Sequence, residues 1–74
     1  MNIEYEKYVG HNIRRLREKQ GLTQEQLSAR LQTMGCDITR SALAKMEVGQ
    51  RHIYLDEIKL ITNLLSTDYS SLLD

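Results

Sequence analysis

Residues 23–49 read TQEQLSARLQTMGCDITRSALAKMEVG, and this stretch contains two consecutive helix starts. Thr23 is a typical N-cap residue, and Gln26 stands at the third helical position, where it can complete a capping box. Leu22 before the cap and Leu27 after it can pack together as a hydrophobic staple. The pattern therefore predicts a helix that begins directly after Thr23.

The second helix start follows the same pattern. Thr39 is its N-cap, and Ile38 and Leu43 are its staple pair. A helix is predicted from Arg40 to about Val48, and Gly49 ends it.

The helix that begins after Thr23 is predicted to run over 24–34, with one apolar stripe formed by Leu27, Leu31 and Met34. Gly35 ends this helix and leads a short turn. Two short helices joined in this way are the layout of a helix-turn-helix, which places its second helix in the major groove of DNA.

Length and composition indicate one small, all-α domain over 1–74, with the helix-turn-helix at about 23–49. A chain of 74 residues buries only about 60% of its unfolded surface. It has no proline, which suits helices joined by short turns. One cysteine and two histidines support neither a disulfide nor a zinc site. We expect a cytoplasmic protein without cofactor, metal or enzymatic activity, because no signal peptide, membrane span or catalytic constellation is visible.

The net charge is zero, but the charges are unevenly distributed along the chain. Residues 1–20 carry a balance of +2, residues 21–52 a balance of +1, and residues 53–74 a balance of −3. A basic face on a neutral protein is enough for a local electrostatic contact with DNA, although the same charges can simply solvate a small domain.

The first helix of the chain is predicted from an apolar stripe at helical spacing: Tyr5, Val9, Ile13 and Leu16. It begins near Asn2 or Ile3, and Gly21 ends it. Gly10 interrupts it at a cost of about 1 kcal/mol relative to alanine. A glycine at this place indicates either the close approach of another helix or a tolerated defect.

A fourth helix is predicted over 55–65, with a stripe formed by Leu55, Ile58, Ile61 or Thr62, and Leu65. A last short helix follows, capped by Ser66, Thr67 or Asp68. Leu72 and Leu73 then either cover the core or close a dimer interface.

The candidate base-reading residues are those that the third helix leaves on its outer side when Leu43 and Met46 face inward: Arg40, Ser41, Ala44 and Lys45. Arginine and lysine suit the guanine edge, serine pairs with several bases, and alanine can meet a thymine methyl group.

The loop after this helix contains Arg51, which could hold a phosphate. His52 in the same loop and His11 in the first helix are expected to be solvent-exposed side chains without a ligand role. Cys36 is either a plain loop cysteine or a redox sensor.

The chain resembles the phage repressor/Cro-type helix-turn-helix family, also called the XRE family, over about residues 9–73. The combination of GLTQ at 21–24 with a hydrophobic-Glu-x-Gly motif at 46–49 is the strongest part of the match. The residues that carry the resemblance are Val9, Gly10, Ile13, Leu16, Arg17, Gly21, Leu22, Thr23, Gln24, Leu27, Ile38, Thr39, Leu43, Met46, Glu47 and Gly49.

The resemblance implies five helices and DNA binding by paired subunits. It implies that the backbone amide and side chain of Gln24 contact a phosphate, and we expect Thr39 to do so at the start of the recognition helix. It matches Arg40, Ser41 and Lys45 with base-reading positions. It also implies an architectural ion pair between Arg17 and Glu47. The segment 32–37 departs from the family, because it makes the turn longer than in the simplest members.

These observations together predict a sequence-specific transcriptional regulator, a repressor that binds a palindromic operator as a dimer. The alternative is a protein-interaction module, or an antitoxin-like regulator, that binds a partner protein through residues 55–73.

Overall fold

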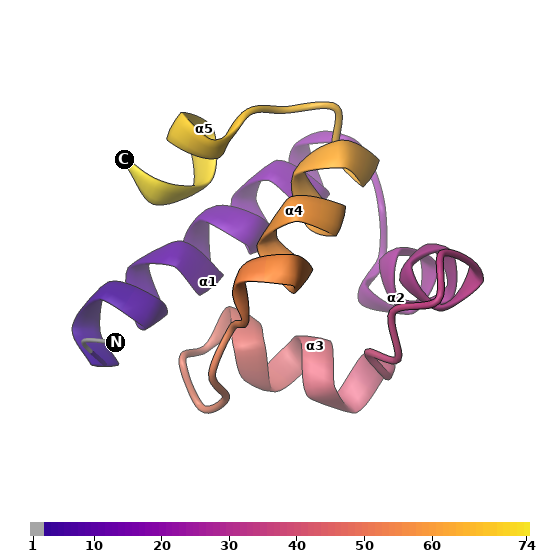
Figure 1. The fold of residues 1–74 in the computed structure, drawn as a ribbon, viewed down its shortest axis with the longest axis horizontal. Helices are drawn as coiled ribbons and strands as arrows, with labels where there is room; N and C mark the ends of the chain where they lie inside the picture. Colours follow the sequence, from indigo (N-terminus) through magenta and orange to yellow (C-terminus); the bar gives the residue numbers. More distant parts are fainter. Residues whose placement is uncertain (1–2) are drawn as a thin grey trace.

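The computed structural model describes residues 3–74, and this part of the chain contains five α-helices and no strand (Figure 1). The predicted all-α, five-helix fold is confirmed. Asn2, one of the two expected first helical residues, lies outside the described residues. The helices are α1 (Ile3–Lys19), α2 (Gln24–Thr33), α3 (Arg40–Glu47), α4 (Leu55–Leu64) and α5 (Tyr69–Leu73).

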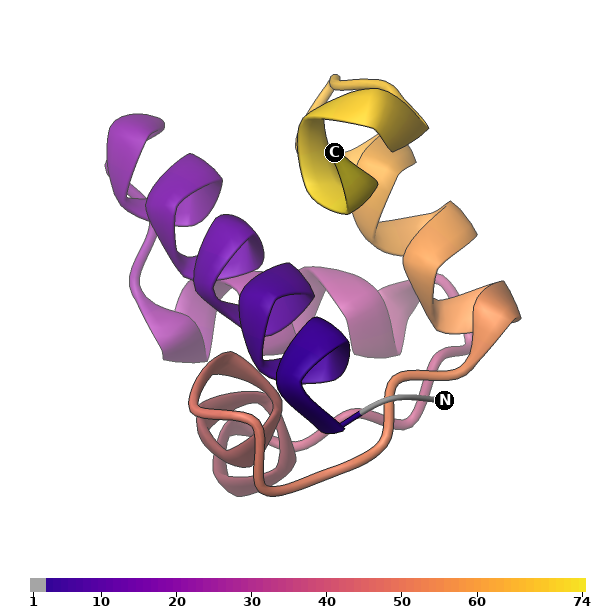
Figure 2. The same ribbon diagram turned by 90° about the vertical axis from the view of Figure 1, so that its left-hand side faces the viewer.

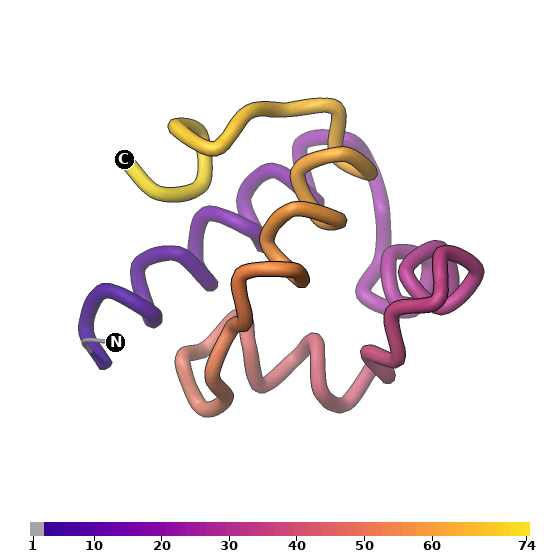
Figure 3. The backbone as a smooth tube through the Cα atoms, viewed as in Figure 1, coloured from indigo at the N-terminus to yellow at the C-terminus, as the bar shows by residue number. Residues whose placement is uncertain are grey.

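The helices surround one apolar core. α1 packs against α3 and α5, α2 packs against α3 and α4, and α4 also packs against α5. α3 and α5 lie on opposite sides of the molecule (Figures 1 and 3). The loop between α3 and α4 passes close to the first turns of α1 (Figure 2). None of the helices within residues 3–74 is long and apolar enough to cross a membrane.

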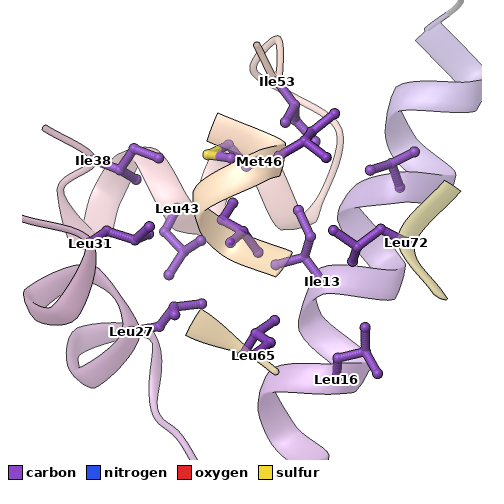
Figure 4. Close-up of a cluster of buried hydrophobic side chains, with 13 residues drawn as sticks. Ile13, Leu16, Leu27, Leu31, Ile38, Leu43, Met46, Ile53, Leu65 and Leu72 are labelled. Atoms are coloured by element: carbon purple, nitrogen blue, oxygen red, sulfur yellow. The ribbon is translucent and has the colours of Figure 1, made fainter. Parts of the chain in front are cut away.

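The core draws side chains from every helix and from the three connections that follow α2, α3 and α4 (Figure 4). Ile38, in the turn before α3, and Ile53, in the loop after it, close the core from the side of the helix-turn-helix. The buried apolar residues are Val9, Ile13, Leu16, Leu27, Leu31, Ile38, Leu43, Met46, Ile53, Ile58, Ile61, Leu65 and Leu72.

The crossing of α1 and α3 depends on Gly10. A Cβ atom added to Gly10 would lie 2.0 Å from the carbonyl oxygen of Met46, which is far closer than any real contact. Of the two interpretations of this glycine, close helix approach is therefore right and a tolerated defect is wrong.

Three residues expected in apolar stripes are exposed instead: Tyr5, Met34 and Leu55. Tyr5 lies at the edge of α5, where its hydroxyl donates to the carbonyl oxygen of Leu73, and Glu6 takes the buried position. Met34 is the C-cap of α2, so the chain has already left the helix there. Leu55 is the first residue of α4, and the buried face of that helix begins a turn later.

α5 closes the core on the side opposite α3. Asp68 caps it by accepting a hydrogen bond from the N–H of Ser71, and Leu72 is fully buried. This burial supports the interpretation of Leu72 as a core residue. Side chains of α1 donate to three consecutive carbonyl oxygens at the end of α5, from Asn12 to Leu72, from Tyr5 to Leu73 and from Tyr8 to Asp74.

We predict that Gly10→Ala destabilises the protein, although alanine is the better helix former. The new methyl group would collide with backbone rather than with a flexible side chain, which costs about 1–3 kcal/mol or more. His11→Ala, at the exposed neighbouring position, is the control and should change the free energy of unfolding little. Chemical denaturation measures both, and equal stability of Gly10→Ala and wild type would contradict the close contact.

Candidate nucleic-acid interface

Both helix starts of the helix-turn-helix form as the sequence predicts. The hydroxyl of Thr23 accepts a hydrogen bond from the N–H of Gln26 at 3.0 Å, and the Gln26 side chain accepts one from the Thr23 N–H at 2.9 Å. Thr39 accepts from the N–H of Ala42 at 3.1 Å. Each cap satisfies a donor that a helix N-terminus leaves unpaired, so both helices have a fixed first residue.

The turn between α2 and α3 is longer than that of a minimal helix-turn-helix, and hydrogen bonds tie it to α2. Gly35 adopts a positive φ of 83°, and the N–H of Cys36 then donates to the carbonyl oxygen of Leu31 at 3.0 Å. The hydroxyl of Ser28, on the buried face of α2, donates to the carbonyl oxygen of Ile38 at 2.7 Å. These contacts hold the start of α3 against α2.

Cys36 lies half-buried in this turn, and burial raises the pKa of its thiol. A raised pKa keeps the thiol protonated and unreactive. This environment supports the interpretation of Cys36 as a plain structural cysteine over a redox sensor.

The faces of α3 are divided as the sequence predicts. Leu43 and Met46 are fully buried, and Arg40, Ser41 and Lys45 are exposed on the other side of the helix. Ala44 is half-buried and lies beside Arg40, four residues away on the same side of the helix. Ser41 and Lys45 are four residues apart and lie on one face of α3, and Arg40 stands beside them at the first position of the helix. Their role as base readers stays a prediction.

A buried ion pair fixes the C-terminal end of α3. Arg17 on α1 donates from Nε to Glu47 Oε2 at 2.8 Å and from a terminal nitrogen to Glu47 Oε1 at 3.0 Å. The side chains are 8% and 1% exposed. The hydrogen bonds to Glu47 raise the pKa of Arg17, although burial acts in the opposite direction. The expected architectural pair is thus present, and these two charges are not available to DNA.

Arg17 and Glu47 each bind a further group that sequence reasoning did not identify. Arg17 also donates to the carbonyl oxygen of Leu22 at 2.7 Å, which holds the turn between α1 and α2. Glu47 Oε1 also accepts from the side-chain nitrogen of Gln24 at 3.0 Å. Gln24 is the first residue of α2, so this small network joins three helices. No local sequence signal marks the contact, because its partners lie far apart in the chain.

Arg51, the candidate phosphate ligand after α3, is paired within the protein. Its guanidinium donates to both carboxylate oxygens of Glu57, at 2.9 and 3.0 Å, and to the carbonyl oxygen of His52 at 2.8 Å. The carboxylate of Glu57 therefore largely balances the positive charge of Arg51. A phosphate contact of Arg51 stays a prediction and would rely on its remaining N–H groups.

His52 has an exposed side chain, as expected, but it is not without a partner. Its Nδ1 atom lies 2.9 Å from a carboxylate oxygen of Glu6, which is itself buried. Glu6 also accepts from the N–H of Ile53 at 3.3 Å. The hydrogen bond with His52 lowers the pKa of Glu6. Together with the Arg51–Glu57 pair, these contacts fix the loop that follows α3.

Five helices around one core, with a capped α2 and α3 and a polar, basic outer face on α3, define the class of helix-turn-helix DNA-binding proteins. Residues 13–72 match the family described as Helix-turn-helix, and the chain belongs to this family. The resemblance to phage repressor/Cro-type proteins, the XRE family, is thereby confirmed.

A solved structure has the same fold. The crystal structure of the DNA-binding domain of BldD superposes with a TM-score of 0.83 over 100% of both chains, at 20% sequence identity. A comparison with curated proteins found no match.

We predict that Glu47→Ala lowers the free energy of unfolding by about 3–5 kcal/mol, because it leaves the buried charge of Arg17 unpaired. Glu18→Ala is the matched control, since it breaks the exposed pair with Arg14, in which the side chains are 53% and 55% exposed. Such a pair contributes about 0–1 kcal/mol. Denaturation of both variants tests the difference, and an unchanged melting temperature of Glu47→Ala would refute the architectural role.

A second prediction concerns pH. Burial acts to raise the pKa of Glu57, but the hydrogen bonds from Arg51 and from the Tyr54 N–H outweigh it and hold this pKa below its ordinary value of 4.5. A carboxylate with a lowered pKa stabilises the fold above its unfolded-state pKa and loses this contribution as the pH falls through the folded-state value.

Glu57→Gln should therefore reduce the free energy of unfolding by about 1–3 kcal/mol near neutral pH. The difference from wild type should shrink as the pH falls below 4.5. Urea denaturation across an acidic pH series measures it. A difference that stays constant down to about pH 2 would show that the charge of Glu57 does not matter.

Proposed function

We propose that this protein is a sequence-specific transcriptional regulator that places α3 in the major groove of its operator. The observation that carries the proposal is the outer face of α3, where Arg40, Ser41 and Lys45 are exposed while Leu43 and Met46 hold the inner face in the core. A helix held in this way presents donors that suit guanine and other base edges in the major groove. Ala44 beside them would meet a thymine methyl group.

Contacts with the DNA backbone would set the register of this helix. The N-termini of α2 and α3 carry unpaired backbone N–H groups, which favour an anion. In this proposal Gln24 and Thr39 bind phosphates at these two ends, and Arg51 adds a contact beside them. The acidic residues Asp68 and Asp74 lie at α5, on the side of the molecule opposite α3 (Figure 3). This distribution would turn α3 toward DNA.

The proposal includes a dimer on a palindromic site and repression by occupying the promoter. Successive major grooves on one face of DNA are about 34 Å apart. The longest extent of this chain is 29 Å, so two copies fit side by side in successive grooves. A cytoplasmic location belongs to the same proposal.

Selection from a random DNA pool with the purified protein tests this function. An enriched palindrome with half-sites about one helical turn apart is the expected result, and binding should weaken steeply with salt because neutralised phosphates release counterions. A folded protein that enriches no sequence would refute the proposal.

Arg40→Ala and Lys45→Ala should each weaken binding to the selected site by about 1–3 kcal/mol and relax the preference at one base pair. Lys59→Ala, at an exposed position on α4, is the control and should leave the preference unchanged. Fluorescence titrations with the selected duplex and with single-base variants measure the effect. Equal weakening on all duplexes would make these residues phosphate contacts instead of base readers.

A second candidate function is protein binding through the start of α4. Leu55 is 79% exposed there, next to the exposed ring of Tyr54, whereas the other leucine and isoleucine residues of 55–73 are buried or half-buried. An apolar contact with a partner would depend little on salt, which separates it from DNA binding. An antitoxin-like regulator would show both kinds of binding.

A further inference from the structure

The side chain of Gln24 has a fixed orientation in this structure. Its nitrogen atom lies 3.0 Å from Glu47 Oε1, and a carboxylate can only accept hydrogen bonds. The NH₂ end of the amide must therefore face Glu47, and the carbonyl end must face away. Glu47 is held in turn by two hydrogen bonds from Arg17, so the orientation rests on a buried, rigid group.

This orientation matters for phosphate binding. A carbonyl oxygen cannot donate to a phosphate, and one of the two amide hydrogens of Gln24 is already given to Glu47. The backbone N–H of Gln24 is different, because it is at the first position of α2 and has no partner within the helix. The main chain at the start of α2 thus offers the donors that an anion needs, and the side chain is turned toward α3.

We propose that Gln24 is a positioning residue, whose side chain ties the start of α2 to the end of α3 through Glu47, while main-chain N–H groups bind the phosphate. This inference rests on the proposed function and changes one part of it, since the sequence predicted a phosphate contact by both the backbone and the side chain of Gln24. The bond to Glu47 sets the distance between the phosphate anchor and the base-reading face of α3.

The test uses Gln24→Met, which keeps the length of the side chain and removes the amide. We expect it to weaken binding to the selected duplex by about tenfold, because the start of α2 is no longer held at a fixed distance from the outer face of α3. Binding to a scrambled duplex should weaken less. In the second measurement, a neutral methylphosphonate replaces each DNA phosphate of a half-site in turn, and the binding affinity is measured for each duplex.

The phosphate that faces the start of α2 should show the largest loss of affinity when a methylphosphonate replaces it. This loss should be the same factor for wild type and Gln24→Met. Independence of the two changes is the signature of a main-chain contact. If the methylphosphonate loss disappears in Gln24→Met while the melting temperature is unchanged, the side chain is itself the phosphate ligand and the proposal is wrong. Unchanged affinity and base preference of the variant would also overturn it.

A readout without DNA separates this inference from the proposed function. In wild type, the side-chain amide proton of Gln24 that is bonded to Glu47 should exchange slowly with solvent in NMR spectra and show a contact with Glu47. The exposed glutamine Gln50 is the internal reference and should exchange fast. Fast exchange at Gln24 would refute the orientation, whereas failure to select any DNA sequence would refute only the DNA-binding role.

Discussion

The ion pair between Arg17 and Glu47 is the interaction on which the helix-turn-helix depends. Removing two charges from water costs several kcal/mol per ion, and this cost is offset only when the hydrogen bonds around the pair are complete. Here the guanidinium binds both carboxylate oxygens and the carbonyl oxygen of Leu22, and the carboxylate accepts a further bond from Gln24. A shift of α3 against α1 or α2 would leave some of these groups unpaired, so the pair selects one arrangement of three helices.

Gly10 strengthens this selection at the same helix crossing. It lets the backbone of α1 approach the carbonyl oxygen of Met46, directly before Glu47 in the chain. The end of α3 therefore has both a steric contact and a charged contact with α1. The outer face of the helix can carry basic and polar residues without loss of order, because its position is set from the inside.

The sequence predicted most of the helix-turn-helix because the signals there are local. The caps at Thr23 and Thr39 involve residues three positions away, and the buried positions of Leu43 and Met46 follow from helical period. The same helical period wrongly predicted that Tyr5 and Leu55 are buried. It tells which residues share a face, but it does not tell where a neighbouring helix stops covering that face.

The candidate site was predicted less completely, since several of its contacts join distant parts of the chain. The pairing of Glu6 with His52 and the bond from Gln24 to Glu47 depend on the tertiary arrangement. The pairing of Arg51 with Glu57 is closer in sequence and could have been suspected from the acidic first turn of α4. The Arg51–Glu57 pair shows that a basic loop residue beside α3 is not by itself an unpaired charge.

The attachment of α5 to α1 has a practical consequence. Side chains of Tyr5, Tyr8 and Asn12 hold the carbonyl groups of residues 72–74, so Asp74 is fixed on the side of the molecule away from α3 (Figure 1). A segment joined after Asp74, such as a fluorescent protein or an affinity tag, would leave the fold on that side, away from the outer face of α3. A label attached at Asp74 would therefore lie away from the face of α3 that the proposed function assigns to DNA.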